Sequence, residues 1–273
     1  YQKNINRKGS INKKSINISI RLIIRDYMNV KMIGAGAIFS KDNSACYLID
    51  NKILIDIPNG TLKGILRQEI DISKLECILI THFHADHFFD LPFVLLSLFN
   101  KRDGKKSKPL YIVCNDSERG KVKDILNLSN FRSYEEFCDK LNIKIVGVKE
   151  NNHKFDKVDG YVIRSYKVKH TAEAYGFVIE DNDNKKIGFT GDSCLCDGVE
   201  KIIKNSDAIF CDTSKLVGDD NAHMGCDNII QLSSKYVDKK IITSHMYFDA
   251  KCEIIKLNIP NLIVGNDGLE INI

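Results

Sequence analysis

Short apolar segments separated by polar turns run through the chain from about residue 30 to the C-terminus. Such segments predict β-strands, and longer stretches with apolar positions three and four apart predict amphipathic helices. The predicted strands cover residues 30–34, 45–49, 52–57, 76–80, 110–114, 143–148, 162–168, 174–179, 186–190, 208–211, 240–243, 261–264 and 269–273. The predicted helices cover residues 88–99, 116–128, 133–141, 198–204 and 227–236. Strands come first and helices after in each half, which favours two sheets packed together with helices outside.

The chain of 273 residues with 43% hydrophobic residues is predicted to form one folded domain, residues 28–273. Residues 1–27 are rich in Asn, Lys, Ile and Ser with little periodicity, and we expect a disordered basic extension there. An arm that touches RNA is the alternative interpretation. Residues 1–31 hold eight Lys or Arg and one acid, which is a net charge of +7. Because the whole chain has a net charge of +4, residues 32–273 carry about −3. The body of the chain is therefore not a general polyanion binder.

Cysteine usage and hydropathy predict a reduced, cytoplasmic protein. The nine cysteines are scattered without an even framework of spacings, which is typical of a chain that forms no structural disulfides. Arg21 and Arg25 interrupt the Ile-rich N-terminal segment, so it does not resemble a signal peptide, and no apolar run is long enough to span a membrane.

The most informative segment is Ile78-Leu-Ile-Thr-His82-Phe-His84-Ala-Asp86-His87, an apolar strand that ends in a cluster of metal-ligand side chains. If residues 82–84 stay extended, the alternation of side chains places His82 and His84 on one side of the chain. Asp86 and His87 would then open the next helix and could face a second metal ion.

These four residues cannot complete two coordination spheres, so further ligands are expected at the ends of later strands. His170, Asp192 and His245 each follow an apolar segment, where open sheets expose functional side chains. Asp192 is the natural bridge between two cations because its carboxylate has two oxygens. Zinc suits these nitrogen and carboxylate ligands best, although manganese or iron is also compatible with a set that lacks thiolates.

The spacing His-x-His-x-Asp-His, followed by a further His, Asp and His, resembles the metallo-β-lactamase superfamily over about residues 30–273. The resemblance implies an α/β fold, the four-layer αββα sandwich, with a binuclear metal site at one edge. It also implies that a metal-bridging hydroxide attacks an ester, amide or phosphodiester. We expect one ion at His82, His84 and His170 and the other at Asp86, His87 and His245, with Asp192 between them.

Within the superfamily, the segments Met32–Gly36, Asn43–Ala45, Leu54–Gly60 and Thr81–His87 resemble ribonuclease Z and related phosphodiesterases. So do Ile209–Ser214, Ala222–Met224 and Thr243–His245. The likeness implies that His223 donates a proton to the leaving oxygen and that Asp212 orients it. Asp86, His223 and Asp212 are thus the candidate catalytic residues, Asp86 being also a metal ligand. The family resemblance further makes a homodimer possible.

One departure concerns the long arm with which bacterial ribonuclease Z grips tRNA, expected between the third His motif and the Asp motif. Only residues 171–191 separate His170 from Asp192, and they predict a strand pair with a turn. A small phosphodiester, such as a cyclic nucleotide or a short oligonucleotide, is therefore as good a substrate as RNA 3′ ends. Two alternatives stay open, namely a lactone or thioester hydrolase on the same site and a non-catalytic sensor of a nucleotide or metal.

Overall fold

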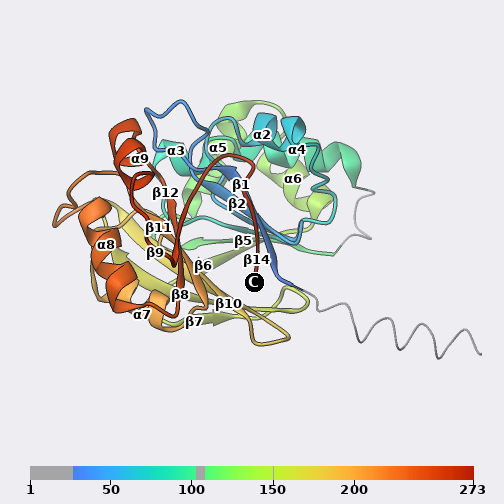
Figure 1. The fold of residues 1–273 in the computed structure, drawn as a ribbon. Helices are drawn as coiled ribbons and strands as arrows, with labels where there is room; N and C mark the ends of the chain where they lie inside the picture. The colour runs from blue at the N-terminus through green and yellow to red at the C-terminus, as the bar shows by residue number, and fades with distance from the viewer. Residues whose placement is uncertain (1–26, 103–107, 150) are drawn as a thin grey trace, which may run out of the picture.

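The computed structural model describes residues 27–102, 108–149 and 151–273, and all of the predicted disordered extension except Tyr27 lies outside these residues. Two seven-stranded sheets face each other, with helices on both outer sides (Figure 1). The first sheet runs in the order β14 (Glu270–Asn272), β1 (Asn29–Gly34), β2 (Cys46–Ile49), β3 (Ile53–Ile55), β4 (Cys77–Leu79), β5 (Leu110–Asn115), β6 (Ile143–Val148). The second runs β13 (Leu262–Val264), β12 (Lys240–Ser244), β11 (Ala208–Asp212), β10 (Lys186–Phe189), β9 (Glu173–Asp181), β8 (Tyr161–Lys169), β7 (His153–Phe155).

The helices of the first half of the chain cover one outer face of the sandwich, and those of the second half cover the other. The first group packs on the first sheet and consists of α2 (Thr61–Arg67), α3 (Ala85–Phe88), α4 (Leu91–Lys101), α5 (Gly120–Ser129) and α6 (Tyr134–Leu141). The second group packs on the second sheet and consists of α7 (Asp197–Lys204), α8 (Cys226–Lys235) and α9 (Phe248–Ile254). The layers are thus helices, sheet, sheet and helices, as predicted (Figure 1).

Alternation along the strands of the first sheet separates two hydrophobic cores. Ile53 and Ile55 of β3 lie in the core between the sheets, whereas Leu54 lies in the core beneath the first group of helices. In β4, Leu79 faces the other sheet and Ile78 faces the helices. A strand buried on both faces has no polar side, which explains the continuous apolar runs of the sequence.

Several elements differ from the sequence prediction. The predicted helix 88–99 is two helices, α3 and α4, because the chain turns at Asp90 and restarts with Pro92 in the first turn of α4. α2, α9 and β7 were not predicted, since helices of seven residues and a strand of three show too little of the helical or strand period. His153, which lies in a polar stretch of the sequence, is half-buried in β7 and pairs with Ser165.

Parallel strands direct their carboxyl ends to one edge of the sandwich. β3, β4 and β5 are mutually parallel in the first sheet, as are β10, β11 and β12 in the second. The two sheets are tied together near this edge by a hydrogen bond of 2.6 Å from the Tyr47 hydroxyl to Ser244 and by one of 3.0 Å from Tyr175 N–H to the Thr81 carbonyl. In the described part of the chain, no helix is long and apolar enough to cross a membrane.

Candidate metal centre

The segment that follows β4 carries four of the candidate residues. The chain bends at Thr81 after the end of β4, His84 is extended with φ −71° and ψ 148°, and α3 begins at Ala85, directly before Asp86. The imidazole rings of His82 and His84 lie on one side, with centroids 4.6 Å apart, whereas Phe83 packs into the core beneath the helices. The alternation expected from the sequence therefore brings both imidazoles toward the second sheet.

The second sheet supplies the remaining candidates from the ends of three strands. His170 follows β8, Asp192 follows β10, and His245 follows β12. Gly191 has a φ of 59° and lets the chain turn before Asp192, and His245 itself has a φ of 51°, which is uncommon for a residue with a Cβ. Such backbone is retained where surrounding contacts hold it, and it occurs often at functional sites.

Four imidazoles lie around the carboxylate of Asp192. Its Oδ2 lies 3.3 Å from His87 Nε2, 3.4 Å from His245 Nε2, 3.9 Å from His170 Nε2 and 4.0 Å from His82 Nε2. His170 Nε2 is also 3.2 Å from His84 Nδ1, and Asp86 Oδ2 is 3.6 Å from His245 Nε2. Ligand bonds of about 2.0–2.2 Å place the donor atoms of a tetrahedral ion roughly 3.3–3.6 Å apart. The separations of 3.3, 3.4 and 3.6 Å match this spacing, and that of 3.2 Å lies just below it.

The hydrogen bonds of three histidines, His82, His87 and His245, leave the nitrogens that face this centre open. Buried Nε2 atoms of His82, His87 and His245 have no hydrogen-bond partner among the described residues. On the other side of each ring, Nδ1 of His82 lies 3.1 Å from Thr81 Oγ1 and Nδ1 of His87 lies 2.8 Å from Asp56 Oδ2. Nδ1 of His245 lies 2.8 Å from Ser214 Oγ. Unpaired buried polar atoms are costly, and a group of them around one carboxylate is a donor set that a bound cation would satisfy. The residues present therefore fit divalent metal ions.

Two clusters of donor atoms correspond to the two expected ligand sets. His82, His84 and His170 form one, and Asp86, His87 and His245 form another. Asp192 forms a third cluster with His82 and His87, which places it between the two sets.

A fourth cluster behaves differently. It contains Asp212 and His223 together with Asp192 and His245. His223 Nδ1 lies 2.8 Å from Asp212 Oδ2, which is hydrogen-bonding distance and shorter than the separation of two ligands of one ion. Asp212 also accepts hydrogen bonds from the backbone N–H groups of Ser193 at 3.1 Å and Ser214 at 3.0 Å. The contact between Asp212 and His223 is thus that of a hydrogen-bonded carboxylate–imidazole pair.

Charge within the centre is balanced between carboxylates and imidazoles. Burial alone would raise the pKa of Asp192, but His245 and His87 outweigh it and hold this pKa well below its usual range. Burial would lower the pKa of His87, but Asp192 and Asp56 raise it to about 10. Burial would also lower the pKa of His223, but the Asp212 carboxylate raises it above its usual value. His223 is thus biased toward the protonated form, which can donate a proton.

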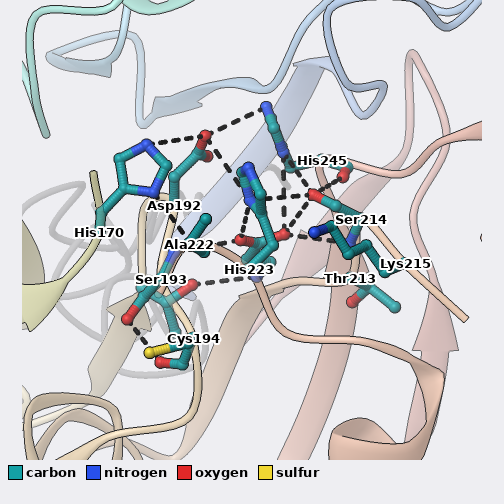
Figure 2. A network of polar contacts seen from close by, with 12 residues as sticks. His170, Asp192, Ser193, Cys194, Thr213, Ser214, Lys215, Ala222, His223 and His245 are labelled. Atoms are coloured by element: carbon teal, nitrogen blue, oxygen red, sulfur yellow. Dashed lines mark hydrogen bonds and ion pairs between the residues drawn. The ribbon is translucent and has the colours of Figure 1, made fainter. Parts of the chain in front are cut away.

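Two residues that hold the site in place were missed in the sequence. Asp56 is buried and accepts hydrogen bonds from Thr81 N–H and Thr81 Oγ1, both at 2.8 Å, as well as binding His87. Ser214 donates to Asp212 at 2.6 Å while its oxygen faces His245 Nδ1 (Figure 2). A carboxylate within the apolar run Leu54-Ile-Asp-Ile-Pro was the available signal for Asp56; Ser214 had none, because its partners are distant in sequence.

Comparison with known proteins bears on the fold and the family. Ribonuclease Z of Staphylococcus saprophyticus is 30% identical over 131 residues, which are 48% of this chain and 40% of that protein. This chain thus matches well under half the length of that relative. The metallo-β-lactamase fold protein YhfI from Bacillus subtilis superposes with a TM-score of 0.69 at 18% identity, covering 91% of this chain and 100% of that one. The short form of human tRNase Z also has a TM-score of 0.69, at 18% identity, with 89% and 98% covered.

These likenesses confirm the predicted metallo-β-lactamase fold and the resemblance to ribonuclease Z, and they support the prediction of a metal-dependent hydrolase. A family model for the anti-Pycsar protein Apyc1 matches residues 28–256, which is most of the chain. The chain therefore belongs to the Apyc1 family of anti-Pycsar proteins, on a metallo-β-lactamase fold.

Proposed function

We propose that this protein is a binuclear metal-dependent phosphodiesterase that hydrolyses a small substrate, such as a cyclic nucleotide or a short oligonucleotide. The observation that carries the proposal is the group of buried imidazole nitrogens around Asp192 that have no hydrogen-bond partner among the described residues. It lies next to the hydrogen-bonded His223–Asp212 pair, in which Asp212 is buried and His223 is partly exposed. A metal centre beside a proton donor suits the cleavage of a bond to a poor leaving oxygen.

In this proposal His82, His84 and His170 hold one ion, Asp86, His87 and His245 hold the other, and Asp192 bridges them. Zinc is the first choice, with manganese or iron as alternatives, because all ligands are imidazole or carboxylate. Bound divalent cations would lower the pKa of water and stabilise negative charge on the substrate. Asp56 and Ser214 keep the Nδ1 side of His87 and His245 engaged, so that each presents Nε2 to a cation.

The protein's own proton donor is His223. Asp212 binds its Nδ1, which leaves Nε2 as the nitrogen that can reach a substrate. We propose that Nε2 donates its proton to the leaving oxygen of the phosphodiester, and that Asp212 stabilises the charged imidazole beforehand. Asp86 is the third proposed catalytic residue and contributes as a ligand, with its Oδ2 3.6 Å from His245 Nε2 and 3.8 Å from His87 Nε2.

The preference for a small substrate follows from the connection between His170 and Asp192. β9 and β10 form an antiparallel pair joined by a short turn, with Lys186 opposite Glu180. No tRNA-gripping arm is built from these residues, all of which are described. A large folded RNA would therefore have to be held by other parts of the chain.

The test uses the purified chain loaded with zinc or manganese. Hydrolysis of bis(p-nitrophenyl) phosphate and of cyclic nucleotides, without site-specific cutting of a 3′-extended precursor tRNA, is the expected result. Asp192→Asn should lose metal and turnover together. A variant that keeps two metal ions and the full rate would contradict the assignment of Asp192 as the bridging ligand. If the protein hydrolyses an acyl-lactone but no phosphodiester, and His223→Ala keeps this activity, the lactone or thioester hydrolase becomes the better assignment. If it turns over none of these substrates, a non-catalytic sensor is favoured. The possible homodimer stays a prediction, to be checked by light scattering.

A further inference from the structure

The loop between β11 and α8, residues 213–225, controls two imidazoles of the centre at once. Ala222 accepts a hydrogen bond of 2.9 Å from His170 Nδ1, and His223 is the next residue (Figure 2). A hydrogen bond at Nδ1 fixes the tautomer of His170 and leaves the Nε2 lone pair free for a cation. The position of residues 222–223 therefore decides the orientation of His170 and the place of His223 together.

One side chain of this loop, Asp219, holds that segment. Its Oδ1 accepts hydrogen bonds from three successive backbone N–H groups, those of Asn221 at 2.9 Å, Ala222 at 2.5 Å and His223 at 3.2 Å. Its own N–H donates to the His223 carbonyl at 2.9 Å, and Lys215 pairs with its Oδ2. The Lys215 ammonium and these N–H groups hold the pKa of Asp219 well below its usual range, so the carboxylate is ionised at neutral pH.

The ends of the loop are held independently of Asp219. Cys226 N–H donates to the Lys215 carbonyl at 2.9 Å, and Gly218 N–H donates to Asp227 Oδ1 at 2.8 Å. The segment that depends on Asp219 is thus the short stretch that carries Ala222 and His223. Asn221 is exposed and Ala222 is partly exposed, so water can replace the lost acceptor at these positions without unfolding the domain.

We propose that Asp219 is a positioning residue, which acts through Ala222 to present His170 to a cation and through His223 to place the proton donor at the leaving oxygen. Its consequence for catalysis rests on the proposed function, whereas its consequence for metal binding does not. Asp220, the next residue, is exposed and forms none of the hydrogen bonds of Asp219, which makes it a matched control.

The first experiment measures zinc affinity of the purified chain by competition with a chromogenic chelator. Asp219→Ala should weaken zinc binding 10- to 100-fold, the usual effect of removing support behind a ligand, and Asp220→Ala should not. Asp219→Asn keeps one acceptor oxygen, so its zinc affinity should lie between those of Asp219→Ala and Asp220→Ala. This variant preserves the test if the alanine variant of Asp219 does not fold. Wild-type zinc affinity in a folded Asp219 variant would overturn the role toward His170, whatever reaction the protein catalyses.

The second experiment compares two leaving groups at saturating zinc. p-Nitrophenolate leaves bis(p-nitrophenyl) phosphate readily without a proton, whereas the ribose oxygen of a cyclic nucleotide needs one. Asp219→Ala should slow cyclic nucleotide cleavage at least 10-fold more than nitrophenyl ester cleavage. Equal slowing of both would mean a merely structural role and overturn the link to His223. If the wild-type protein cleaves neither ester, the proposed function fails, and the zinc affinities still decide the role toward His170.

Discussion

Asp56 Oδ2 lies 2.8 Å from Nδ1 of His87, and both side chains are buried. The pair joins the end of β3 to α3 and leaves His87 Nε2 directed at Asp192, 3.3 Å away. Asp56 has a φ of 55°, so the chain adopts strained backbone to bring this carboxylate under the metal centre. A carboxylate behind a histidine raises its basicity and fixes its orientation as a ligand.

Removing the charge of Asp56 is therefore expected to weaken metal binding. Asp56→Asn keeps the size of the side chain but presents only one acceptor oxygen to Thr81 and His87. We expect a 10- to 100-fold loss of zinc affinity, measured by chelator competition. The control is Asp71→Asn, an exposed carboxylate that accepts hydrogen bonds from Ser73, and this variant should bind zinc as the wild type does. Equal affinities in the two variants would contradict the role of Asp56.

Replacing the proposed proton donor should separate rate from metal content. His223→Ala should retain its metals and slow cyclic nucleotide cleavage by about 10² to 10⁴, the usual scale of acid catalysis. Mass spectrometry measures the metal content, and kcat on a cyclic nucleotide measures the loss of rate. His153→Ala in β7 removes an imidazole outside the clusters of candidate ligands and should leave both unchanged. An unchanged rate in His223→Ala would discard the proton-donor assignment.

Zinc binding should release protons at neutral pH and tighten as pH rises. The metal-free protein holds His87 with a pKa of about 10, because Asp192 and Asp56 outweigh the effect of burial, so this imidazole is protonated at pH 7. A cation needs the neutral form, and a proton must leave when it binds. The apparent affinity should therefore increase from pH 6 to pH 9. Calorimetry in buffers of different ionisation enthalpy measures the protons released; no release at pH 7 would contradict the prediction.

The turn before Asp192 requires glycine for two reasons that a pair of variants can separate. At Gly191 the φ is 59° and an added Cβ would lie 2.9 Å from Thr81 Cβ, whereas at Gly268 the φ is 82° with nothing within 4 Å. Both alanine variants should lose roughly 1–2 kcal/mol of unfolding free energy from backbone strain. Only Gly191→Ala should also lose zinc affinity, because relief of the clash displaces Asp192 from Thr81. Thermal unfolding measures the loss of stability, and chelator competition measures zinc affinity. Equal zinc affinity in both variants would contradict the expected displacement of Asp192.

The sequence by itself determined the layers of the fold and the set of side chains that meet at the centre. Alternation and apolar runs are local properties, and they identified the main strands of both sheets, as well as the placement of His82 and His84 on one side of the chain. The positions of His170, Asp192 and His245 after strands β8, β10 and β12 could be recognised for the same reason. Where parallel strands end, their side chains reach a common edge.

Only the tertiary structure decided how these side chains are held. The partner of His87 is 31 residues away in sequence, at Asp56, and the carbonyl that orients His170 is 52 residues away, at Ala222. The short helices α2 and α9 and the fold of the loop around Asp219 also escaped prediction. Periodicity within a segment carries no information about which distant segment will lie against it, since that choice follows from packing the two sheets face to face. The orientation of each imidazole, on which any chemistry depends, is therefore a property of the assembled fold.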